Sequence, residues 1–142
     1  MRTRTRLLLL VLLFVGPAWS QFFGGAAGKS DRVTFVLCAG APCQTGADKT
    51  NHFIITDAAK IKRCYITAKV APTGAALVID LKKNGVSILG TTVFGLAAGQ
   101  AGPVRFNLTP VSASELQVIS VDITQIGTTE PGQDVTVVCK LE

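Results

Sequence analysis

Four cysteines and one histidine are the side chains of this chain with the most distinctive chemistry. Cys38 and Cys43 flank Ala-Gly-Ala-Pro, a short turn-forming segment that can bring their Cα atoms within bonding distance. Cys64 and Cys139 each fall in the alternating register of neighbouring apolar residues, so both side chains are expected to point into a core from different strands. The chemistry that this set favours is disulfide formation.

Four cysteines allow three pairings, and their positions favour Cys38 with Cys43 and Cys64 with Cys139. In the alternative interpretation, Cys64 and Cys139 are small buried hydrophobic side chains. A metal site would need Cys38, Cys43, His52 and Cys64 together, but their spacing lacks the Cys-x2-Cys unit that pre-organises a tetrahedral zinc. Disulfides are therefore favoured over a metal site, and no cofactor is predicted.

Candidate catalytic groups are few. His52 lies beside apolar residues and is expected to be exposed at the start of a strand, and no Gly-x-Ser-x-Gly elbow accompanies it. Asp80 and Asp122 fall in segments that resemble neighbouring strands, and two carboxylates in one cleft can hydrolyse a glycosidic bond. Both acids alternate with apolar rows, which favours solvated positions on an outer face. We therefore predict that the protein is not an enzyme, and a small hydrolase is the least favoured function.

Two segments predict the elements that position these groups. In 77–82, apolar and polar residues alternate as in a half-buried strand. Asn84-Gly85 follows, a pair that suits the positive φ angles of a type I′ turn, and apolar residues resume at Val86 to complete a hairpin. Turn residues with restricted or permissive φ precede this hairpin at Pro72 and Gly74, and lie inside a second strand-turn-strand segment, 121–137, at Gly127, Pro131 and Gly132.

Short apolar runs separated by turn residues continue from Arg32 to the end of the sequence, and no segment longer than about ten residues holds a helical period. This pattern predicts an all-β domain over residues 32–142: a two-sheet antiparallel β-sandwich with jelly-roll-like topology and about eight strands. The expected strands are 33–37, 52–56, 61–70, 75–82, 86–94, 103–108, 116–125 and 133–141.

The two turn-containing segments also carry a resemblance. A-P-T-G-x-x-L-V-I-D-x-x-K-N-G-x-S-I (71–88) and V-D-I-x-Q-I-G-x-x-x-P-G-x-D-V-T-V (121–137) resemble a β-sandwich module of bacteriophage virion proteins, notably fibre, tail and receptor-binding components. The module also occurs in uncharacterised bacterial proteins. The resemblance covers Thr45 to Leu141 and implies a structural or adhesive role. Where the family often has a second acidic residue this chain has Thr124, which argues against a cation site there.

Residues 1–20 have the three regions of a secretory signal peptide. Arg2, Arg4 and Arg6 precede a nine-residue apolar run, and Ala18-Trp19-Ser20 forms a small-x-small cleavage site before Gln21. Nine apolar residues are far fewer than the roughly 20 that span a bilayer. The sequence thus predicts a secreted protein, extracellular or periplasmic, with no membrane span. Residues 21–31, rich in glycine and without an apolar period, are expected to form a flexible leader.

Cleavage of the signal peptide lowers the net charge of the chain and so changes which partners are expected. Removing three of the 14 Lys and Arg side chains leaves 11 against nine acids, which argues little for nucleic acid as a partner. The predicted function is a secreted, non-enzymatic structural or adhesive module, and a signal peptide favours a bacterial secreted protein over a virion part. The alternative is a lectin-like domain that binds carbohydrate or a cell surface. Expected contacts are self-association, or a surface partner at the loops 71–73 and 130–134.

Overall fold

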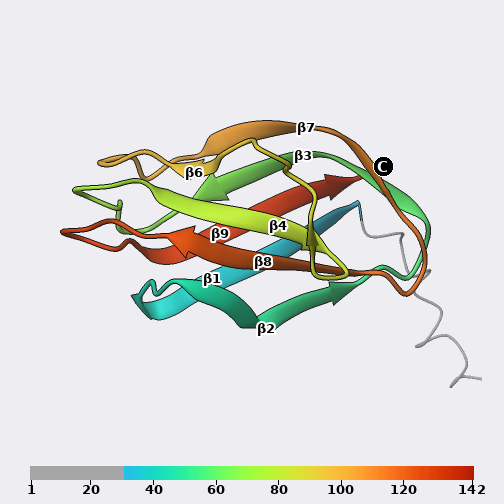
Figure 1. Cartoon of the computed structure of the whole chain (residues 1–142), viewed down its shortest axis with the longest axis horizontal. Helices are drawn as coiled ribbons and strands as arrows, with labels where there is room; N and C mark the ends of the chain where they lie inside the picture. The colour runs from blue at the N-terminus through green and yellow to red at the C-terminus, as the bar shows by residue number, and fades with distance from the viewer. Residues whose placement is uncertain (1–30) are drawn as a thin grey trace, which may run out of the picture.

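The computed structural model of the chain describes residues 31–142, except for the side chains of residues 47–51. The predicted signal peptide, residues 1–20, and the predicted leader as far as residue 30 lie outside the described residues. The described part forms nine strands in two sheets that pack face to face (Figure 1). Within it, no helix is long and apolar enough to cross a membrane.

The two sheets have the strand order of a jelly roll. The four-stranded sheet runs β1-β9-β3-β7, which are Arg32–Pro42, Gln133–Leu141, Ala59–Thr67 and Val104–Ala113. The five-stranded sheet runs β2-β8-β4-β5, which are Gly46–Ile54, Val118–Gln125, Leu77–Lys83 and Val86–Ser87, and β6 (Phe94–Leu96) also pairs with β4. All pairs are antiparallel. The chain crosses between the sheets at every connection except β4–β5 and β5–β6, which confirms the predicted jelly-roll-like sandwich.

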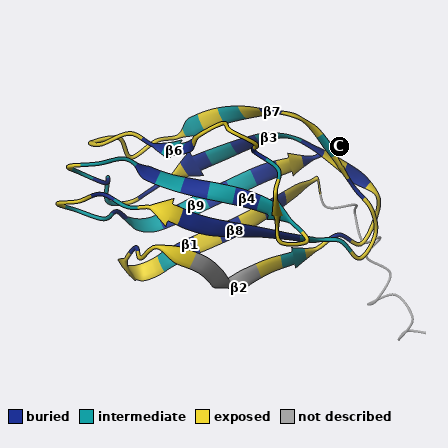
Figure 2. Ribbon diagram, in the orientation of Figure 1, coloured by how far each residue is buried: buried dark blue, intermediate teal, exposed yellow. Residues whose placement is uncertain are grey.

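The core lies between the sheets, where buried and less buried side chains alternate along β1, β4 and β9, whereas β8 is buried on both faces from Ile119 to Ile123 (Figure 2). This alternation is the period-two pattern of a strand with one face on a core. The four-stranded sheet contributes Val33, Phe35, Leu37, Ile61, Ile66, Val135 and Val137, and the five-stranded sheet contributes Leu77, Ile79, Leu81, Ile119, Val121 and Ile123.

The strand expected at 86–94 is wrong, because the chain makes two short strands there instead of one. β5 ends at Ser87, whose Oγ donates to Asp80 Oδ1 (2.6 Å) and accepts from the backbone N–H of Leu89 (3.3 Å). Gly90 then adopts φ +61°, and the backbone N–H of Thr92 donates to the Leu89 carbonyl. This turn leaves the ladder, and β6 resumes pairing at Phe94, so the domain has nine strands rather than eight.

Other strand bounds differ for local reasons. β7 continues to Ala113 past Pro110, whereas the prediction ended it at Leu108. Because β7 is an edge strand, a residue without a backbone N–H is tolerated within it. β2 occupies Gly46–Ile54 rather than 52–56, and its pairing with β8 shifts register between Ala47 and His52.

The β4–β5 hairpin has the turn that the sequence predicts. Asn84 and Gly85 have φ of +50° and +81°, and Lys83 pairs with Val86 across the turn. The Asn84 side chain also accepts a hydrogen bond from the backbone N–H of Val118 at 2.8 Å. The turn therefore fixes both the hairpin and its contact with β8.

Replacing Gly85 with Val is expected to lower the free energy of unfolding by more than about 1 kcal/mol, because a β-branched residue strongly resists positive φ. A Cβ at this position meets nothing within 4 Å, so the loss would come from backbone strain rather than from a clash. Gly85→Asn is the matched control, since asparagine tolerates this conformation and should retain most of the stability. Thermal unfolding of both variants checks the prediction, and an unchanged melting temperature for Gly85→Val would contradict it.

Candidate functional site

All four cysteines form disulfides, with the pairing that the sequence favours. Cys38 and Cys43 are bonded across the end of β1, with a Cα–Cα distance of 5.0 Å. Cys64 and Cys139 are register partners on β3 and β9, with Cα atoms 4.1 Å apart, and both are fully buried. The alternative zinc set is wrong, because its thiols are divided between two bonds. Both disulfides are compatible with an oxidising compartment.

The two segments that carry the phage-module resemblance meet at one end of the sandwich. The backbone N–H of Thr73 donates to the Glu130 carbonyl at 2.9 Å, and the N–H of Thr129 donates back to the Thr73 carbonyl at 3.1 Å. Pro72 and Gly132 are buried in this contact. The expectation that loops 71–73 and 130–134 are exposed contact surfaces is therefore wrong in large part, since these loops bind one another.

Asp80 and Asp122 are direct register partners on β4 and β8 and lie on the outer face of the five-stranded sheet. Asp122 is only 9 % exposed, so the expectation that it is solvated is wrong. Its carboxylate forms an ion pair with Lys82, and this hydrogen bond raises the pKa of the Lys82 ammonium above its usual value. Asp80 accepts from the Ser87 hydroxyl. Partners within the fold thus occupy both carboxylates.

His52 is exposed and lies within β2, opposite Ser120 of β8. It is away from the disulfide sulfurs, which belong to the other sheet or to the segment after β1. Among residues 31–142, apart from the undescribed side chains, no three His, Cys, Asp or Glu side chains are grouped so that they could hold a metal ion.

Cations gather on the outer face of the four-stranded sheet. Arg32 of β1, Lys140 of β9 and Arg63 of β3 are consecutive register partners, so they form a row across three neighbouring strands. A β-bulge between Ile61 and Arg63 inserts Lys62 without a partner of its own on β9. We call this surface the basic face and define it by Arg32, Lys62, Arg63, Tyr65, Arg105 and Lys140.

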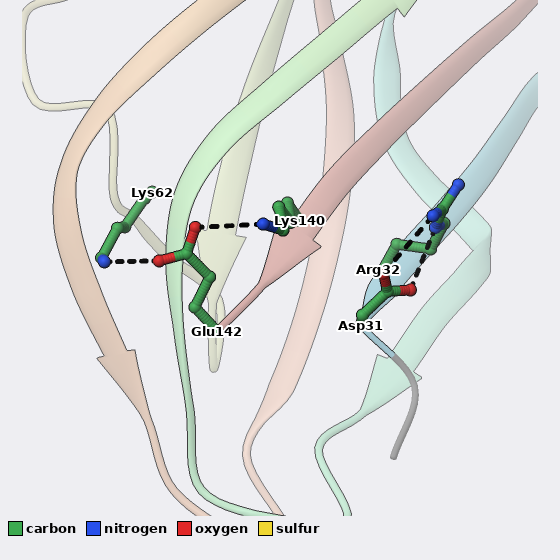
Figure 3. Close-up of polar contacts among 5 residues, drawn as sticks. All are labelled: Asp31, Arg32, Lys62, Lys140 and Glu142. Carbon is green, nitrogen blue, oxygen red and sulfur yellow. Dashed lines mark hydrogen bonds and ion pairs between the residues drawn. The ribbon is translucent and has the colours of Figure 1, made fainter. Parts of the chain in front are cut away.

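Two carboxylates lie at the margin of the basic face (Figure 3). Glu142 lies between Lys62 and Lys140 and pairs with both, and the hydrogen bond from Lys62 is the main reason that the pKa of Glu142 is lowered. Asp31 pairs with Arg32, which lowers the pKa of Asp31 and raises that of Arg32. Within residues 31–142, no described carboxylate pairs with Arg63 or Arg105.

Tyr65 lies at the centre of the basic face. Cys64 and Ile66 on either side of it are buried in the core, so Tyr65 points outward, between Val138 of β9 and Arg105 of β7. A shallow depression of about 220 Å³ opens here, and its walls are Asp31, Arg32, Tyr65, Val138 and Lys140. The arrangement can hold an anionic group beside a half-buried aromatic ring.

Sequence reasoning missed this surface. The signal available was the polar residues at alternate positions of two segments, 63–65 and 105–107, together with Lys140 two positions after Val138. Each segment alone is an ordinary solvent-facing row, and only the register of the strands brings the rows together.

Comparison with known proteins does not identify a relative, because no protein-family model and no curated protein sequence matches this chain.

Proposed function

We propose that this protein is a secreted, non-enzymatic adhesive module that holds a surface partner against the outer face of its four-stranded sheet. The observation that carries the proposal is the basic face, where five cationic side chains share one sheet surface with a tyrosine, and the only described carboxylates that pair with them are Asp31 and Glu142. Antiparallel sheets commonly pack one face on the core and leave the other exposed to solvent, so such a face is free for binding.

The two disulfides support a location outside the reducing cytoplasm. Cys64–Cys139 joins β3 to β9 within the four-stranded sheet, and Cys38–Cys43 joins β1 to the residue that follows it, so the face would keep its shape in an oxidising and variable environment. The resemblance to phage fibre-type modules points the same way, because that module is a structural or adhesive unit.

The proposal of a non-enzymatic role rests on what the acidic side chains do. Asp122 is engaged by Lys82, and Asp80 by Ser87, on a continuous strand surface. A pair of glycosidase carboxylates must instead face the substrate across a cleft, one as acid and the other as base or nucleophile.

Self-association is the second candidate function, and a different surface favours it. Ile54, Val86 and Leu116 are 55 %, 70 % and 77 % exposed, and all three lie at the end of the sandwich where β2 and β4 end and β8 begins. Leu116 also has φ +65°, a strained conformation for a bulky residue. Exposed apolar groups of this kind are typical of contact surfaces between proteins.

Secretion, adhesion and assembly are separable by experiment. The chain is expressed for export, its intact mass is measured, and its oligomeric state is determined by light scattering before it is passed over an array of glycans and polymers. We expect a product that begins at Gln21 and a monomer that an immobilised polymer retains. Filaments or defined oligomers without retention would contradict adhesion and favour assembly, and a product that keeps residues 7–15 would contradict secretion by cleavage.

A further inference from the structure

We propose that the ligand of the basic face is an acidic polysaccharide, a polymer of sugar rings that carry carboxylate or sulfate groups. This inference rests on the proposed adhesive function and deepens it, because it names the chemistry of the partner.

The basic face carries a row of cations. Neighbouring strands lie about 4.8 Å apart, so Arg32, Lys140 and Arg63 place three positive charges side by side across β1, β9 and β3. Like charges directly opposite one another on a sheet are destabilising. An anionic polymer laid across the strands would offset this repulsion along the whole row.

The cations of the basic face are unequally paired with carboxylates. Lys62 and Lys140 share the single carboxylate of Glu142, and Arg32 pairs with its neighbour Asp31. Arg63 and Arg105 have no described carboxylate partner, and Arg105 only donates to the Asn107 side chain at 3.0 Å. Arginine presents a planar fork of donors that suits carboxylate and sulfate oxygens. These two arginines are therefore the strongest candidates for direct contact with the ligand.

Tyr65 makes the basic face suited to sugars as well as to anions. Its half-buried ring lies between Val138 and Arg105, beside the depression of about 220 Å³ that Arg32 and Lys140 also line. An aromatic ring with a polar hydroxyl offers an apolar face for a sugar ring and a hydrogen-bonding group at its edge. One aromatic ring together with five cations suits a polymer in which sugar rings carry negatively charged groups.

Nucleic acid fits this surface less well. Duplex DNA carries a negative charge about every 1.7 Å along its axis, a closer spacing than the row of cations, which lie on neighbouring strands about 4.8 Å apart. Single-stranded binders stack successive bases on several aromatic side chains, whereas the basic face has only Tyr65. The disulfides also favour an oxidising compartment outside the cytoplasm, where cell-surface polysaccharides occur.

The test measures the affinity of the oxidised full-length product for polygalacturonate and heparin, with neutral dextran, a single-stranded oligonucleotide and anionic phosphatidylglycerol vesicles as comparisons. Arg63→Glu/Arg105→Glu removes the two unpaired arginines. The matched control Lys69→Glu/Lys83→Glu changes the net charge by the same amount at two residues that are not part of the basic face, although it also removes the hydrogen bond from Lys83 to the Ser112 carbonyl. Circular dichroism melting checks that every variant is folded.

We expect binding to both acidic polysaccharides that weakens as NaCl is added, because salt screens exposed charges. The arginine variant should lose at least about tenfold in affinity at low salt and the lysine control less than about threefold. Tyr65→Leu should weaken binding by about threefold to tenfold, as expected for loss of one aromatic contact, while Tyr65→Phe, which keeps the ring and removes only the hydroxyl, should lose less than Tyr65→Leu.

Four results would overturn the inference. Equal losses in the arginine variant and the lysine control would mean that the basic face is not the site. Tighter binding to the oligonucleotide or to the vesicles than to either polysaccharide would name a different partner class. Salt-independent retention on dextran, with full affinity in the arginine variant, would refute an acidic ligand but not the adhesive function. Binding to no surface or polymer would refute the proposed function itself.

Discussion

Replacing Cys64 and Cys139 together with alanine should lower the free energy of unfolding by about 4 kcal/mol. The bond joins residues 75 apart in sequence, and in the chain-entropy model the loss of so long a closed loop releases a large conformational entropy in the unfolded state. Both residues are fully buried between β3 and β9, so the substitution also removes packed sulfur atoms from the core. Denaturant unfolding monitored by circular dichroism measures the loss.

Cys38→Ala/Cys43→Ala is the matched control for this prediction. Its bond joins residues only five apart, and the same model gives a loss of about 2 kcal/mol. A larger loss for the short bond than for the long one would contradict the account. Peptide mapping without reduction, on protein recovered from an oxidising compartment, checks the pairing itself. Cys38 linked to Cys139, or four free thiols, would be incompatible with the two bonds described.

Gly127→Ala is expected to have the second largest effect, a loss of about 3 kcal/mol. A Cβ on Gly127 would overlap the carbonyl oxygen of Glu130 and lie 2.8 Å from the backbone N and O of Thr73. Those atoms are backbone and pair with each other, so they cannot move aside without breaking the contact between the two segments. Inserting even one methyl group into such a packed site typically costs about 1–3 kcal/mol or more.

The control for Gly127 is Gly85→Ala, a glycine whose added Cβ meets nothing within 4 Å. Its cost should be limited to the strain of φ +81°, about 1 kcal/mol. Urea unfolding of both variants at one temperature gives the comparison. Equal losses would mean that the loops around Thr73 and Glu130 can separate without harm, and that the end of the sandwich is not held by this contact.

Local patterns were enough to predict the β-sandwich and the disulfides. The alternation in 77–82 and the Asn84-Gly85 pair determine a hairpin within a few residues, and Cys64 and Cys139 take the register of their apolar neighbours. These features depend on the two-residue period of a strand and on the residue types that favour a turn, and residues close together in the sequence specify both.

The features that the sequence did not predict depend on contacts between strands. The break between β5 and β6 depends on the Ser87 hydroxyl reaching Asp80, and the burial of Asp122 depends on its place between two neighbouring strands. The basic face needs β1, β9 and β3 to lie side by side, which no local pattern specifies. Its bulge at Lys62 also interrupts the alternation, so the periodicity around that residue gave no clue that the side chain belongs to the same surface.

The most direct measurement of the central claim is an amide chemical-shift titration of the oxidised protein with polygalacturonate. The account predicts that the largest shift changes fall on the basic face, centred on Tyr65 and its neighbours on β7 and β9, and that added NaCl reverses them. Changes concentrated around Asp80 and Lys82 of the five-stranded sheet, or at the apolar end formed by Ile54 and Leu116, would contradict it.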